Sequence, residues 1–73
     1  MAGQGLWAEA IAQYQATVRL RPGVFQAHFN LAGALASAGR RAEAIAEYEA
    51  ALRLRPNSVE ARHNLERLSA GKD

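Results

Sequence analysis

The stretch Arg53-Leu54-Arg55-Pro56 repeats without change the stretch Arg19-Leu20-Arg21-Pro22, and the offset between them is 34 residues (56 − 22). Upstream of it, Gly5, Ala8, Glu9, Ala10, Ile11, Ala12, Tyr14 and Ala16 recur at the same offset as Gly39, Ala42, Glu43, Ala44, Ile45, Ala46, Tyr48 and Ala50. Downstream, Ala27, Asn30 and Leu31 recur as Ala61, Asn64 and Leu65. A fixed period of this length predicts a stacked repeat architecture.

Within each period the apolar residues follow helical spacing, as in Ala10, Ile11, Tyr14, Thr17 and Val18. Breaks fall at Pro22-Gly23, Gly39 and Pro56-Asn57, where proline and glycine favour turns. We therefore predict four helices, near residues 6–20, 25–37, 41–54 and 58–69. Asn57, with Glu60 three residues on, resembles a capping box at the start of the last helix. Because the connections are short, neighbouring helices should run antiparallel.

Length and composition narrow the class of protein. A chain of 73 residues holds one small domain, and without cysteine it has no disulfide, thiolate nucleophile or cysteine zinc site. The first residues lack the pattern of a signal peptide, and no apolar run is long enough for a membrane span. A formal charge of +2 does not by itself indicate nucleic acid or anionic membrane as partner. We expect a soluble, cytoplasmic protein.

The period and its marker residues resemble the tetratricopeptide repeat. Leu31-Ala32 with Leu35 fits the first-helix motif, Gly39 the turn, Ala44, Tyr48 and Ala51 the second helix, and Pro56 the end. The resemblance implies an all-α solenoid of antiparallel helical hairpins within a single domain, 1–73. One full repeat, 25–58, would be flanked by a second-helix half-repeat, 5–22, and a terminal first-helix half-repeat, 59–70. We expect Ala32, Leu35, Ala44, Ile45, Tyr48, Ala51 and Leu52 in the central packed layer.

The last helix departs from the family pattern. Glu66 stands where the family usually has a small residue that lets a second helix approach. Arg62, His63, Glu66 and Arg67 make one side polar, while Ala61, Leu65 and Leu68 supply one apolar stripe. These features predict a capping helix.

The opposite end begins with a second helix whose first helix is absent from the sequence. Trp7, Ile11 and Tyr14 would then lack part of their usual cover, and an exposed apolar strip often marks an interface. Either the chain is part of a longer array or another subunit supplies the cover. We expect self-association through these three residues, most simply as a homodimer.

The family resemblance also implies a binding groove lined by the first helices. Asn30 and Asn64, one repeat apart, would form a ladder there, since a carboxamide can pair with the main chain of an extended peptide. The residues expected to flank the ladder and to supply selectivity are Phe29, His63, Gln26, Glu60 and Arg67. The structural alternative is that both asparagines bond within the fold.

Other chemistry finds little support in the sequence. His28 and His63 have no third ligand at a recognisable spacing, so we interpret them as solvated helix residues and expect no metal, cofactor or enzymatic activity. Arg19, Arg21, Arg53 and Arg55 could form a basic rim, yet arginine in a helix's last turn also complements the helix dipole. Three functions remain open: peptide or protein binding, structural self-assembly, and nucleic-acid binding, which the 34-residue period disfavours.

Overall fold

Four α-helices make up the fold of the computed structural model, which describes the backbone of residues 2–71 and the side chains of residues 7–71. They are α1 (Ala2–Leu20), α2 (Phe25–Ser37), α3 (Arg41–Leu54) and α4 (Val59–Ala70). Each helix packs against its neighbour in the chain. The described residues contain no strand, so the predicted all-α hairpin fold is confirmed.

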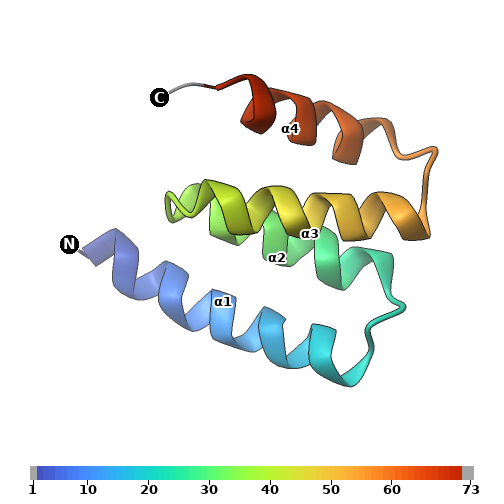
Figure 1. Cartoon of the computed structure of the whole chain (residues 1–73). Coiled ribbons are helices and arrows are strands. Elements are labelled where there is room, and N and C mark those ends of the chain that lie inside the picture. Colours follow the sequence, from blue (N-terminus) through green and yellow to red (C-terminus); the bar gives the residue numbers. More distant parts are fainter. Residues whose placement is uncertain (1, 72–73) are drawn as a thin grey trace.

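The helices form a thin slab with principal extents of 36 × 33 × 15 Å. Figure 1 shows that the α1–α2 and α3–α4 turns, which contain the two prolines, lie at one edge of the slab. The α2–α3 turn lies at the opposite edge, together with the start of α1 and the end of α4. No described helix combines the length and the apolar character needed to cross a bilayer.

The α2–α3 turn depends on Gly39, as the sequence predicted. Its φ of 83° lies in the left-handed region, which residues with a Cβ rarely adopt. Main-chain bonds close the turn, including one from the Arg40 nitrogen to the Leu35 oxygen at 2.9 Å. These bonds satisfy carbonyls that the end of α2 leaves unpaired.

Two apolar clusters share the interior. The first joins α1, α2 and α3 and comprises Ile11, Leu31, Ala34, Leu35 and Ala44. The second joins α2, α3 and α4 around Ala32, Tyr48 and Ala61, and Leu68 packs against both. Ala32, Ala44, Ala51 and Ala61 are fully buried, because small residues at these positions allow the helices to approach closely.

The structure corrects the sequence predictions at several points. The first helix begins at Ala2 rather than near residue 6. The last is capped by Ser58, whose hydroxyl accepts a bond from the Ala61 nitrogen at 3.2 Å, so the Asn57 capping box is wrong by one residue. Ile45 and Leu52 are only half-buried, because so thin a slab covers few positions from all sides.

The apolar strip predicted on α1 is also smaller than expected. Ile11 is only 3% exposed, because it packs in the first cluster against α2. Tyr14 is half-buried beside that cluster, and Trp7 is 37% exposed. Only Trp7 and part of Tyr14 therefore remain at the surface.

Candidate groove on the first helices of the repeats

The predicted groove residues come from α2 and α4. Phe29, Asn30 and Asn64 are half-buried. The four residues expected to supply selectivity, Gln26, Glu60, His63 and Arg67, are exposed. The structure thus places three of the seven side chains partly within the packed helices and four on the surface.

Tyr48 of α3 connects the groove residues of the two helices. Its hydroxyl accepts a hydrogen bond from the Asn64 amide nitrogen at 3.2 Å. Its ring meets the Phe29 ring edge-on, with centroids 5.7 Å apart. A Cβ added to Gly33 would lie 3.8 Å from the same hydroxyl. Phe29 and Gly33 of α2 and Asn64 of α4 are therefore brought together around Tyr48, and we call these four residues the Tyr48 cluster.

The second asparagine has a different partner. The Gln26 amide nitrogen donates to the Asn30 amide oxygen at 2.9 Å, one turn along the same helix. The Asn30 amide nitrogen and the Asn64 amide oxygen have no further hydrogen bond to a described residue. Asn30 thus keeps an unused amide donor and Asn64 an unused amide acceptor, although each side chain already forms one hydrogen bond within the fold.

Phe29 is mainly a packing residue. Its ring stacks on Phe25 with centroids 5.5 Å apart, in addition to its contact with Tyr48. Phe25 is in turn covered by the Arg55 guanidinium, 4.7 Å from the ring centroid. Glu60, His63 and Arg67 form no side-chain hydrogen bond or ion pair with the Tyr48 cluster within residues 7–71.

The burial of His28 contradicts the sequence-based interpretation of this histidine as a solvated helix residue. His28 is 8% exposed, and its Nε2 lies 2.8 Å from the Pro22 carbonyl oxygen. Because a carbonyl only accepts, Nε2 carries a hydrogen and donates it. Its Nδ1 lies 2.8 Å from the Glu47 carboxylate, so one side chain ties the α1–α2 turn to α3. His63, by contrast, is exposed.

Arg62 lies one repeat after His28 and holds the α3–α4 turn in the way that His28 holds the α1–α2 turn. The Arg62 guanidinium donates to the Pro56 carbonyl at 3.0 Å. From the sequence, His28 was interpreted as a solvated helix residue and Arg62 only as part of the polar side of the last helix. The shared hydrogen-bonding capacity of the two side chains was the signal that could have revealed this role.

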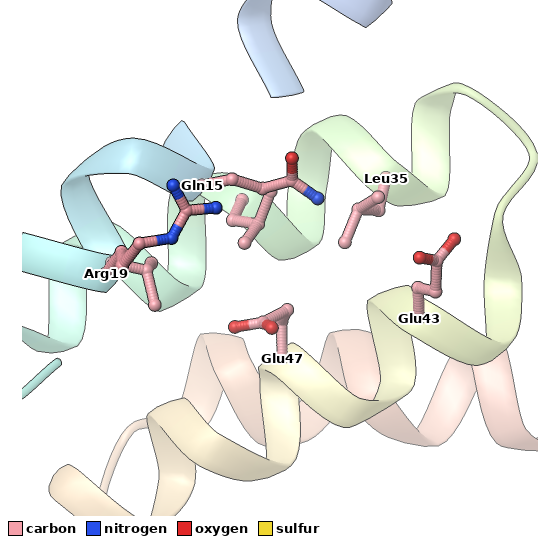
Figure 2. A pocket seen from close by; sticks show the side chains of 7 residues that line it. Gln15, Arg19, Leu35, Glu43 and Glu47 are labelled. Atoms are coloured by element: carbon pink, nitrogen blue, oxygen red, sulfur yellow. The ribbon is translucent and has the colours of Figure 1, made fainter. Parts of the chain in front are cut away.

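A hollow of about 370 Å³ lies between α1, α2 and α3, away from the Tyr48 cluster. Figure 2 shows Gln15 and Arg19 reaching over it from α1 and Glu43 and Glu47 from α3. Val18, Leu31 and Leu35 supply its apolar lining. Glu47 already pairs with His28, and Glu43 pairs with Arg40 at 2.6 Å. Because both carboxylates have partners within the chain, we assign this hollow no ligand.

A metal site would need several ligating side chains close together. The described residues contain no group of three or more histidine, cysteine, aspartate or glutamate side chains placed to hold a metal ion.

Comparison with known proteins places the chain in a family. A family model of the tetratricopeptide repeat matches residues 2–59, which is most of the sequence. A comparison with curated proteins finds no match. With a 34-residue period, four antiparallel helices and this match in agreement, the chain belongs to the tetratricopeptide repeat family, whose members are generally protein-interaction modules built on a typically non-enzymatic scaffold.

Proposed function

We propose that this protein binds an extended segment of a partner protein across α2 and α4, with Asn30 and Asn64 as the main-chain contacts. The observation that carries the proposal is the pair of unused amide groups, one donor on Asn30 and one acceptor on Asn64. An extended peptide alternates N–H and C=O groups along its main chain, so it offers a partner for each. Such binding would be independent of the peptide's side chains.

The surroundings of the two amides favour an ordered site. Asn64 is oriented by the Tyr48 hydroxyl and Asn30 by Gln26. Side chains that are already fixed lose less entropy when they bind. Gln26, Glu60, His63 and Arg67 are exposed on the same two helices and would distinguish partners by charge and hydrogen bonding. The same proposal divides the chain into a half-repeat at 5–22, a full repeat at 25–58 and a terminal half-repeat at 59–70. It also includes a cytoplasmic location.

Replacing both asparagines tests the proposal. Each hydrogen bond contributes a net of about 0.5 to 1.5 kcal/mol, so Asn30→Ala with Asn64→Ala should weaken binding of a library-selected peptide roughly thirtyfold. Isothermal titration calorimetry measures the affinity and thermal unfolding the stability. Gln13→Ala is the control, because it removes an exposed carboxamide from α1.

The structural alternative gives a different result in the same experiment. Asn64→Ala removes the partner of the Tyr48 hydroxyl, whereas Asn30→Ala removes only an exposed bond to Gln26. If the asparagines are purely structural, the double variant will lose stability and keep its affinity. That outcome would reject Asn30 and Asn64 as the main-chain contacts of a bound peptide.

Self-association through α1 is a second candidate function, favoured by one observation. Trp7 is 37% exposed, although tryptophan is a residue that folded proteins usually cover. With Ile11 in the core, the contact would rest on Trp7 and the exposed part of Tyr14. A second copy meeting this strip would give a homodimer.

A further inference from the structure

Exposed aliphatic side chains gather at the slab edge that contains the two proline turns. Leu20 is 82% exposed and Val59 78%, while Leu54 and Val24 are 40% and 38% exposed. All four lie within residues 19–26 and 53–62, which we call the proline edge; Figure 1 shows its two turns on the same side of the molecule. Single exposed aliphatic residues are ordinary, but two at each turn of one edge make that edge a candidate for binding.

The same edge is strongly basic. It contains Arg19, Arg21, Arg53, Arg55 and Arg62 but only one acidic residue, Glu60. All five arginines are exposed, and none forms an ion pair with a carboxylate of the described residues. Complementing the helix dipoles accounts for arginine at the ends of α1 and α3, but it does not account for the exposed leucines and valines beside them.

Both turns of this edge are held in place. The Pro22 carbonyl accepts from His28 and the Pro56 carbonyl from Arg62, so equivalent side chains fix the two turns. The Arg55 guanidinium is further positioned over the Phe25 ring. A surface that is already ordered loses less entropy on binding.

The α3–α4 turn also contains a hollow of about 430 Å³. Leu54, Arg55, Pro56, Asn57 and Ser58 line it. It combines an aliphatic side chain with a guanidinium and two small polar groups. An apolar side chain of a partner could enter it while a neighbouring carboxylate meets Arg55.

We propose that the proline edge is a second binding surface, adjoining the groove at Gln26 and Glu60, for an acidic polypeptide segment that also carries apolar side chains. Its carboxylates meet the unpaired arginines, and its apolar side chains cover Leu20, Leu54 and Val59. Single-stranded nucleic acid fits less well, because the edge exposes aliphatic side chains and its Phe25 ring lies under Arg55. A membrane surface has no side chain to place in the hollow at the turn.

The probe for this surface is a short fluorescein-labelled peptide in which glutamate and leucine alternate. Fluorescence anisotropy should show binding that weakens with added salt, since exposed charges are screened. Arg21→Gln with Arg55→Gln should weaken it roughly five- to tenfold, as expected for two exposed ion pairs. Leu20→Ser with Val59→Ser tests the apolar part and should also weaken binding. Because both side chains are mostly exposed, this second variant should keep its fold.

Matched controls separate this surface from general charge and from the groove. Arg40→Gln with Arg41→Gln removes the same charge at the opposite edge and should leave the affinity for the probe unchanged. Asn30→Ala with Asn64→Ala should also leave it unchanged, because those residues belong to the groove. A probe with glutamine in place of glutamate should bind at least fivefold more weakly.

Several results would overturn the proposal. One is equal binding of the acidic and uncharged probes, and another is an equal loss in the Arg40 and Arg41 variant. Stronger binding to phosphatidylserine vesicles or to a single-stranded oligonucleotide, lost in the Arg21 and Arg55 variant, would assign the edge to that other partner. A dimer that dissociates in the same variant would assign it to a second copy of this chain.

Discussion

A buried histidine is tolerated in this fold because both of its ring nitrogens have partners. His28 lies between the Pro22 carbonyl and the Glu47 carboxylate, each 2.8 Å away. Burying a polar group without such partners costs free energy, so the arrangement is stabilising only while it is complete. The two contacts join the α1–α2 turn, α2 and α3 through one side chain.

Glu47→Ala should therefore destabilise the fold. It leaves the His28 Nδ1 without its partner in a mostly buried position, which should cost about 1 to 3 kcal/mol. Thermal and urea unfolding measure the loss. Glu49→Ala is the control, because Glu49 is exposed on the same helix and should change stability by less than about 0.5 kcal/mol. Equal stability of the two variants would contradict the role given to His28.

A second residue-scale prediction concerns pH. The hydrogen bond from Arg40 lowers the pKa of the Glu43 carboxyl below its ordinary value. The stabilisation from this pair is thus present above the ordinary pKa of glutamate and is lost as pH falls through the lowered one. NMR titration should show a higher Glu43 pKa in Arg40→Gln than in the wild type. Arg53→Gln, at the other end of α3, should leave the Glu43 pKa at its wild-type value. A Glu43 pKa that is unchanged in both variants would refute the prediction.

Single residues were the hardest features to predict from sequence. The helical period placed Asn30 and Asn64 on equivalent turns, but it could not show that Asn64 already bonds the Tyr48 hydroxyl. That contact depends on how closely α3 and α4 approach, which no local pattern encodes. A tyrosine at a core position does indicate that its hydroxyl needs a partner, and this clue was available.

At the scale of helices, close packing depends on alanine. Ala44 on α3 is fully buried and packs in the cluster that includes Leu31 and Leu35 of α2. A larger side chain there has to displace the helices or adopt a strained rotamer. The alanines therefore set the spacing of the slab as much as the leucines fill it.

Ala44→Leu should cost about 1 to 3 kcal/mol of stability through overpacking. Ala42→Leu makes the same chemical change at an exposed position of α3 and should be nearly neutral. Thermal unfolding of the two variants isolates the effect of the close contact. An unchanged melting midpoint for Ala44→Leu would count against the packing described here.

Helices were largely predictable because their signals are local. The predicted spans 25–37 and 41–54 coincide with α2 and α3, where Gly39 and the prolines end the helices. The start of α1 was placed near residue 6 because the helical apolar spacing begins there, whereas the helix extends back to Ala2 through Gly3 and Gly5, which are poor helix formers. The cap of α4 was misassigned because Asn57 and Ser58 are both good capping residues and only backbone geometry distinguishes them.

The whole molecule is a slab only 15 Å thick, so most side chains keep some contact with solvent. Leu35 is the largest side chain that is almost completely enclosed among the described residues. A domain of this size buries only about 60% of the surface of its unfolded chain, which leaves little stability in reserve. Covering a further apolar surface by association would therefore be favourable.

We predict that the chain self-associates through α1, and Trp7 is the residue at which this prediction can be tested. If α1 supplies the contact, the mass measured by light scattering should rise with protein concentration. Trp7→Glu should give a monomer at every concentration, because it places a charge where an indole would be buried between two copies. Its own fold should persist, since Trp7 is 37% exposed in the single chain.

Gln13→Glu is the matched control for the charge. It adds the same negative charge to an exposed position of α1, and it lies six residues from Trp7, on a different side of the helix. Association through Trp7 and the exposed part of Tyr14 predicts that this variant still dimerises. If it dissociates as well, added charge alone explains the effect of Trp7→Glu. A wild-type mass that stays monomeric at all concentrations would reject self-association, and the groove would then be the better supported account of what this protein does.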